Sequence, residues 1–385
     1  MPNAPSITIT PLETSAGFGA SVEGVDLNQL DEQTFKTLER ALYIHKLLVI
    51  RGQAALHPSS QLALVKRFDP NSAGVHGHGT ATQVMEGFKG KKSLVGANPA
   101  VPCEPMVRML GRTVVPVGHF GTEEEVTLRS GSHVGFHKEP LTEAEMLGGE
   151  TRFQRWHIDA PFYRTHPPKV TSLWSKILPR GPDLTARFDD GSGMTMKVPP
   201  GLTAFLDTTR MYESLSDEDK AWVQWSEVEY APSPYQWIQD AKALGNGFGM
   251  VSDGLETPFD ELPSNDESLV MRYPLLWTNP LDGSKALQVH HLVVRKLFRK
   301  RSADGPEEII DDVPTLRQIL YDLQRPFLIP ENILVPSAEE GDLTLWWNRG
   351  LRHTAMEYPS EGYGDRLCHQ VHVSSSFSSE PPRPS

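Results

Sequence analysis

The hydrophobic pattern of the first part of the chain alternates between strand and helix signals. After Asp31, apolar residues recur at near-helical spacing and predict a helix over 32–46. A second helix is expected over 61–68, with Ser59 or Ser60 as its N-cap. Short apolar runs that predict strands lie at 7–11, 20–25 and 47–51. The pattern therefore predicts a strand, helix, strand unit at the start of the chain.

Two long polar segments follow, at about 69–104 and about 118–150, and a strand is expected between them at about 105–116. The second segment contains the acidic run Glu123–Glu125, which is expected on a solvated face. Irregular segments of this length within a domain are usually lids or binding walls. We therefore expect both segments to form a lid over a substrate site.

From Thr151 onward, short apolar runs recur at close intervals between Pro, Gly and Asp turns, which is typical of a β core. The predicted strands are 152–158, 169–177, 184–188, 194–198, 202–206, 269–277, 285–289, 341–348, 352–358 and 366–374. A helical stretch is expected within 209–225 and a helix at about 312–324. A polar, glycine-rich insertion lies near 240–268, and a turn at 279–283 predicts a hairpin. The fold class is therefore mainly β with flanking helices.

Composition and charge narrow the class of protein. A chain of 385 residues with 38% hydrophobic and 22% charged residues can form one globular domain, expected at 1–375, with a disordered tail at 376–385. No apolar run of about 18 residues is present, so membrane insertion is not expected, and the start lacks the basic and apolar pattern of a secretion signal. The net charge of -12 disfavours nucleic acid as a partner. Cys103 and Cys368 fit a reduced compartment, and we expect a cytoplasmic protein with a small-molecule substrate.

The segment Trp156-His157-Ile158-Asp159 is the first candidate for chemistry. A strand projects residues i and i+2 from one face, so His157 and Asp159 are expected to point together. His353 follows a distant strand and can supply a third ligand. Two histidines and one carboxylate on one side of a metal ion, with open positions opposite, are typical of non-haem Fe(II) oxygenases.

Other histidines compete with this candidate. His137-Lys138-Glu139 has a similar composition, and His76 and His78 lie in a glycine-rich stretch. We interpret all of them as ordinary loop residues. Trp174, Trp346 and Trp347 lie on predicted strands and could form a wall of the metal site, although simple core packing is the favoured explanation for each of them taken individually.

Arg366 lies thirteen positions beyond His353 and begins the last predicted strand. A guanidinium group can hold a carboxylate through two parallel hydrogen bonds, which a lysine ammonium cannot do with the same geometry. We therefore expect Arg366 to bind the distal carboxylate of 2-oxoglutarate.

At this point the chain resembles the TauD/TfdA-type Fe(II)/2-oxoglutarate-dependent dioxygenases. The resemblance covers about residues 7–375 and includes the segments ITPLETSAGFGASVEGVDL, WHIDAPFYRTHPPKVTSL, EEGDLTLWWNRGLRHTAMEY and DRLCHQ. It implies a double-stranded β-helix core of the jelly-roll or cupin kind with long loop insertions. It also implies Fe(II), 2-oxoglutarate as co-substrate and O2, with succinate and CO2 released and a C–H group of a small metabolite oxidised.

The resemblance assigns roles to five residues. His157, Asp159 and His353 are similar in position to the iron ligands of the family. Arg366 matches the residue that holds the 2-oxoglutarate carboxylate, and Thr185 matches its hydroxyl partner.

Within the family, the chain resembles the fungal xanthine dioxygenase branch, through segments such as WHIDAPFY, RFDDGSGMTMKVPPGLTAF and MYESLSDEDK. The substrate wall of that branch implies amide side chains where this chain has Met106, Arg108 and His372, and a lysine where it has Arg129. An unpaired buried guanidinium is costly unless an anion meets it.

We therefore hypothesise a substrate other than xanthine, with a carboxylate, sulfonate or similar anion near Arg108 or Arg129. Three alternatives stay open. Both arginines could face solvent or pair with Glu124 or Glu125, which would leave conversion of xanthine to urate as the activity. The same metal ligands could hold zinc in a hydrolase, or the chain could bind a small molecule without catalysis. The sequence does not predict the oligomeric state.

Overall fold

A nine-stranded sheet is the frame of the fold. The computed structural model describes residues 7–72, 74, 98–160, 162, 165–251, 254–262, 267–359 and 361–375. In sheet order the strands are β1 (Thr8–Pro11), β2 (Ala20–Glu23), β3 (Leu47–Ile50), β21 (Leu343–Trp347), β8 (Val170–Ile177), β23 (Arg366–His372), β5 (Glu104–Val115) and β4 (Ala100–Val101), and β6 (Val126–Leu128) pairs with β5. Strands from both ends of the chain thus lie side by side, and the prediction of a mainly β protein is confirmed.

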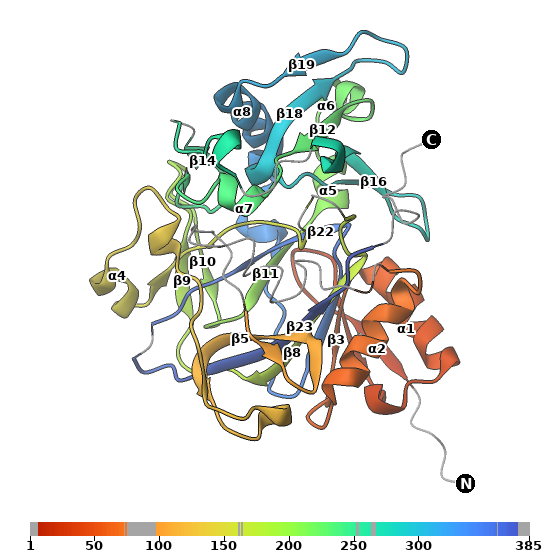
Figure 1. Cartoon of the computed structure of the whole chain (residues 1–385), viewed down its shortest axis with the longest axis vertical. Helices are drawn as coiled ribbons and strands as arrows, with labels where there is room; N and C mark the ends of the chain where they lie inside the picture. The colour runs from red at the N-terminus through yellow and green to blue at the C-terminus, as the bar shows by residue number, and fades with distance from the viewer. Residues whose placement is uncertain are drawn as a thin grey trace.

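Two amphipathic helices, α1 (Glu32–His45) and α2 (Pro58–Phe68), cover one face of this sheet (Figure 1). Their apolar sides share a core cluster with the sheet residues that point toward them. The Asp31 carboxylate caps α1, as the sequence predicts. The cap of α2 differs from the prediction, because the His57 ring accepts from the Ser59 amide and Pro58 occupies the first turn.

A smaller sheet faces the other side of the large one. It consists of β11 (Thr203–Asp207) between β20 (Ile333–Leu334) and β22 (Leu351–Ala355). Residues 152–158, predicted as a strand, form only isolated bridges in the structure, of Phe153 with Met356 and of His157 with His353. These bridges attach the segment to β22 and to the residue that follows it, so two distant parts of the sequence lie side by side.

A further lobe lies beyond this small sheet, at the top of Figure 1. Its sheet is β15 (Arg272–Pro274), β12 (Glu227–Tyr230), β18 (Val294–Arg299) and β19 (Glu308–Ile310), and α8 (Val313–Gln324) packs against it. The sequence pattern predicts α8, and the hairpin of β16 (Leu276–Thr278) and β17 (Lys285–Leu287) closes at Asn279 as expected. The sequence pattern misses β12 and β19, which are only four and three residues long, and β18, whose apolar run is interrupted by basic residues.

The remaining elements are short. They are β7 (Glu150–Thr151), β9 (Leu184–Arg187), β10 (Thr195–Val198), β13 (Lys242–Ala243), β14 (Met250–Val251), α4 (Glu143–Leu147), α5 (Thr208–Glu213), α6 (Asp217–Val223) and α7 (Pro234–Trp237). The helical stretch predicted within 209–225 is thus two helices, and Ser216 caps the second.

The two predicted lid segments have different outcomes. The segment 118–150 contains β6, α4 and 3-10 turns rather than one irregular loop. Most of the segment 69–104, with His76 and His78, and the tail 376–385 lie outside the described residues. Within the described ranges, no helix combines the length and apolarity that a membrane span requires. Cys103 is exposed and Cys368 is buried, and both are free thiols.

Candidate metal centre

His157, Asp159 and His353 converge in the structure. His157 and His353 are directly opposite in an antiparallel bridge, and their backbones exchange two hydrogen bonds of 3.0 Å. The Nε2 atom of His157 lies 4.0 Å from Oδ1 of Asp159, and Nε2 of His353 lies 3.5 Å from Oδ2. One ligand atom from each residue lies within 4.8 Å of the other two, and no second group of this kind occurs among the described residues. The three side chains can therefore share one metal ion.

Neighbouring groups fix the orientation of these ligands. Nδ1 of His157 lies 2.8 Å from the carbonyl oxygen of Arg155, so this nitrogen carries the proton and Nε2 keeps its lone pair for a metal. The Thr171 hydroxyl donates to Oδ2 of Asp159 at 2.9 Å. The side chain of Asn348 exchanges two hydrogen bonds of 2.9 Å with the backbone of Asp159. No local pattern in the sequence identifies Thr171 or Asn348 as partners of Asp159.

The electrostatics favour the metal-binding protonation states. Burial, with the charges of neighbouring groups, holds the pKa of His157 well below its usual range. Burial alone would raise the pKa of Asp159, but the charges of His353, His372 and His157 and a hydrogen bond from His353 hold it well below the ordinary value. Near neutral pH His157 is thus a neutral imidazole and Asp159 an ionised carboxylate, and two imidazoles with one carboxylate are a donor set that fits Fe(II).

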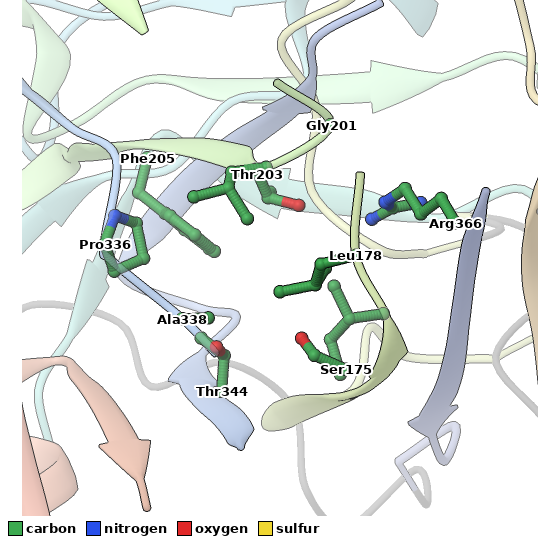
Figure 2. Close-up of a pocket in the computed structure, with 11 residues that line it drawn as sticks. Ser175, Leu178, Gly201, Thr203, Phe205, Pro336, Ala338, Thr344 and Arg366 are labelled. Atoms are coloured by element: carbon green, nitrogen blue, oxygen red, sulfur yellow. The ribbon is translucent and has the colours of Figure 1, made fainter. Parts of the chain in front are cut away.

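Arg366 lines a small cavity next to this centre (Figure 2). The other lining residues are Leu173, Ser175, Leu178, Gly201, Leu202, Thr203, Phe205, Pro336, Ala338 and Thr344. Figure 2 shows the Thr203 hydroxyl pointing toward the Arg366 guanidinium. At the inner side, Phe205 pairs with His353 across β11 and β22, and the two rings stack with centroids 6.0 Å apart. The cavity therefore extends from a guanidinium to the immediate neighbour of a metal ligand.

Thr185 does not line this cavity. It lies on β9, and its hydroxyl accepts a 2.8 Å hydrogen bond from Nζ of Lys197 on β10. Thr185 thus belongs to the β10–β9–β7 sheet, whereas β11, the strand that pairs with the His353 strand, belongs to another sheet. Thr203, which begins β11, is the threonine that the fold brings to Arg366.

The tryptophans divide between the two faces of the large sheet. The Trp346 ring lies 5.0 Å from that of His353, so it packs against the metal centre. Trp174 and Trp347 belong to the core cluster on the helix side of the sheet. Core packing thus explains these two, as it explains His137, which is buried and bonded to the carbonyl of Gln154.

Of the four residues expected to line the substrate site, His372 lies next to the metal ligands, Arg108 is buried on the neighbouring strand, and Met106 and Arg129 lie elsewhere. His372 is buried, and its Nε2 lies 4.0 Å from Oδ1 of Asp159. Arg108 is buried opposite Gln370 on the neighbouring strand, and burial lowers its pKa. Met106 packs against the helix-side core cluster, and Arg129 is exposed.

Gly111 controls the close approach of β5 to the strand that carries Arg366. A Cβ atom at Gly111 would lie 1.8 Å from the carbonyl oxygen of Arg366, a backbone atom that cannot move without separating the strands. We expect Gly111→Ala to lower the free energy of unfolding by about 3 kcal/mol and to raise the 2-oxoglutarate concentration needed for activity. Urea denaturation and co-substrate titration measure the two effects. Gly135→Ala is the control, because a Cβ there meets nothing within 4 Å, and equal stability of the two variants would contradict the prediction.

A two-histidine, one-carboxylate centre on a mainly β fold defines a non-haem metal oxygenase. Residues 110–371 match the model of the taurine catabolism dioxygenase TauD, TfdA family. The chain belongs to this family, as the resemblance implied, and is an Fe(II)/2-oxoglutarate-dependent dioxygenase.

Curated relatives and solved structures agree with this result. The chain is 41% identical over 363 residues to the alpha-ketoglutarate-dependent xanthine dioxygenase xanA of Emericella nidulans, covering 93% of this chain and 94% of that protein. It is 40% identical to the xanthine dioxygenase xan1 of Schizosaccharomyces pombe, covering 94% and 86%. It is 35% identical to the alpha-ketoglutarate-dependent dioxygenase bsc9 of Alternaria brassicicola, covering 92% and 89%. The structure of AAD-2 with Mn(II) and N-oxalylglycine shares the fold, with a TM-score of 0.55 at 18% identity, covering 98% and 99%.

Proposed function

We propose that His157, Asp159 and His353 hold Fe(II), and that Arg366 and Thr203 hold the distal carboxylate of 2-oxoglutarate. The convergence of the three ligand atoms within 4.8 Å carries the proposal. The cavity between Arg366 and Phe205 supports the second part, because it places a guanidinium and a hydroxyl at one end and the neighbour of His353 at the other. In this proposal Thr203 takes the role that the family resemblance assigns to Thr185.

The protein side chains position the reactants. Iron and 2-oxoglutarate supply O2 activation coupled to release of succinate and CO2, and hence oxidation of a substrate C–H group. Arg366 and Thr203 orient the co-substrate so that its keto acid end points to the metal. Thr171 and Asn348 hold Asp159, while the buried rings of Phe205 and Trp346 exclude water from the His353 side.

We further propose that the large sheet and the β20–β11–β22 sheet are the two halves of a double-stranded β-helix within one domain of residues 1–375. Opposed sheets with the metal ligands between them support this. The segments 69–104 and 118–150 remain the proposed lid, and the two free cysteines support a reducing compartment such as the cytoplasm.

The proposed substrate is a small metabolite that carries an anionic group. The positive charge of Arg108, buried on β5 beside the strand that carries His372, is compatible with an anion there, whereas the exposed position of Arg129 does not add to the argument. Xanthine is the second candidate substrate, because relatives at 38–41% identity over most of the chain carry that activity in their names.

The test is co-substrate turnover by purified, iron-loaded protein. We expect O2 uptake and succinate release that require both Fe(II) and 2-oxoglutarate and that small anionic metabolites stimulate more than xanthine. Activity that survives without O2 and with Zn(II) would instead identify a hydrolase, and iron-type metal below a tenth of an equivalent after reconstitution would identify a binding protein. Efficient formation of urate from xanthine would overturn the anionic-metabolite proposal in favour of the second candidate.

A further inference from the structure

The guanidinium of Arg155 has an unusual status among the arginines of this chain. Among the described arginines that are not exposed, Arg155 and Arg366 are the two without any hydrogen bond or ion pair of the side chain, and the Nε atom of each is buried. Other arginines that are not exposed have clear partners. These pairs are Arg152 with Asp189, Arg295 with Glu229, Arg317 with Glu256, Arg325 with Asp190, Arg349 with the Pro167 carbonyl and Arg352 with the Val289 carbonyl. Since Arg366 is the proposed anchor of the co-substrate carboxylate, Arg155 is the second guanidinium that requires an explanation.

Arg155 lies on the metal side of its segment. Trp156 and Ile158 are fully buried in the main core cluster, and Arg155, His157 and Asp159 alternate with them. The carbonyl oxygen of Arg155 lies 2.8 Å from Nδ1 of His157, and its backbone N–H donates at 2.9 Å to the hydroxyl of Thr354, the residue after His353. The side chain is therefore a neighbour of the proposed iron, on an element that the ligands themselves hold in place.

An aromatic ring supports the guanidinium. The Cζ atom of Arg155 lies 5.4 Å from the centroid of the Tyr235 ring. Tyr235 is itself fixed, because its hydroxyl lies 3.3 Å from both the carbonyl oxygen of Ala160 and Nε2 of His290. The His290 ring is in turn 6.3 Å from that of His157. A rigid ring beneath a guanidinium leaves the edge of its fork available for a planar ligand.

The charges of the loaded centre favour an anion at this position. A divalent ion, the Asp159 carboxylate and the keto acid end of 2-oxoglutarate balance one another, and Arg366 balances the distal carboxylate. Arg155 then carries a positive charge that no described acidic side chain neutralises through a hydrogen bond or ion pair. A charge in a desolvated site is costly without a partner of opposite sign.

We propose that Arg155, supported by Tyr235, is a specificity-determining residue that binds a planar oxyanion of the substrate next to the iron. This inference rests on the proposed function and names the chemical class that the site takes. A carboxylate and the ionised oxo group of a heterocycle share this chemistry, and each accepts two parallel N–H donors. Arg155 thus binds substrate as Arg366 binds co-substrate.

The experiment measures binding without turnover. Calorimetry on the protein loaded with Mn(II) and 2-oxoglutarate uses two matched pairs of probes: benzoate with benzamide, and xanthine with hypoxanthine at a pH at which only xanthine is ionised. We expect the wild type to bind one of the two anions. Binding of benzoate would identify the substrate group as a carboxylate, and binding of ionised xanthine would identify it as an ionised heterocycle. Arg155→Gln is expected to weaken that binding by about 10- to 100-fold, with little change for the neutral member of the pair.

Two further variants separate recognition from general effects. Arg155→Lys keeps the charge near Asp159 but loses the fork, so we expect a loss of about 10-fold. Arg67→Gln is the matched control, because Arg67 also lies over a ring, that of Phe35, on the far helix layer, and its variant should bind like the wild type. Wild-type affinity in Arg155→Gln or Arg155→Lys, or a wild type that binds neither anion, would overturn the inference. Absence of iron- and 2-oxoglutarate-dependent O2 uptake in the wild type would instead overturn the proposed function. The two failures are distinguishable, because the binding measurement does not depend on turnover.

Discussion

Replacement of Asp159 by alanine is expected to abolish 2-oxoglutarate turnover, with or without a substrate. Asp159 provides the anionic ligand, with Nε2 of His353 at 3.5 Å and Nε2 of His157 at 4.0 Å from its carboxylate oxygens. Its loss removes the charge that attracts the cation and leaves the two imidazoles as the only protein ligands. We expect activity to fall by more than about 100-fold, since removal of a group that merely orients a ligand already costs about 10- to 100-fold. Succinate release and Fe(II) titration of the same samples measure the two consequences.

The controls separate ligand loss from misfolding. Asp183→Ala removes an exposed carboxylate and should retain both iron binding and turnover. Thr171→Val removes the hydroxyl that donates to Oδ2 of Asp159 and should lower iron affinity by about 10-fold without removing it. A folded Asp159→Ala protein that still turns over 2-oxoglutarate would refute the assignment of the metal ligands.

Two of the proposed metal ligands, His157 and Asp159, were predictable from a local signal, whereas His353 was identified through its place in the family resemblance. The i, i+2 spacing of His157 and Asp159 places both on one side of any extended segment, even though the structure shows isolated bridges there rather than a strand. The groups that orient them were not predictable in the same way. Thr171 is on β8 and Asn348 follows β21, and these strands meet Asp159 only through the order of strands in the sheet.

Arg155 shows the same limit at a neighbouring position. Its place beside the ligands is visible in the sequence, but its lack of a partner is a property of the folded environment. Arg152, three residues earlier, binds Asp189 across the fold. The pattern of hydrophobic residues gives no means to distinguish these two arginines, because the distinction depends on which carboxylates the tertiary structure brings near.

The long-range strands of the far lobe were missed for a related reason. β18 contains the buried Arg295, which forms an ion pair at 2.7 Å with the half-buried Glu229 of β12. Once paired, these charges are compatible with a sheet, but in the sequence the basic residues of β18 interrupt its apolar run, and β12 is too short at four residues for its alternation to stand out. Helices α1 and α8 were predicted because their apolar spacing and their Asp caps are both encoded within a few residues.

Replacement of Arg366 by alanine is expected to raise the KM for 2-oxoglutarate by about 100-fold, with a smaller change in kcat at saturating co-substrate. The guanidinium faces the cavity that extends to Phe205, and no described residue gives it a hydrogen bond or ion pair. It is therefore available for two parallel bonds to the distal carboxylate, and hydrogen bonds to charged groups contribute about 1.5–3 kcal/mol each. Arg366→Lys should recover only part of the affinity, because an ammonium group cannot reproduce the planar pair of donors. Steady-state succinate release over a range of 2-oxoglutarate concentrations measures both parameters.

Two threonine variants test which hydroxyl accompanies this guanidinium. Thr203 lines the cavity with Arg366, whereas the Thr185 hydroxyl is bonded to Lys197 on the neighbouring hairpin. Thr203→Val keeps the shape of the side chain and removes one hydrogen bond, so we expect an increase in the KM for 2-oxoglutarate of about 10-fold. Thr185→Val should leave it unchanged. The opposite result, with an effect at Thr185 and none at Thr203, would show that the β9–β10 hairpin and not β11 contributes to the co-substrate site, and an unchanged KM in Arg366→Ala would show that the carboxylate binds elsewhere.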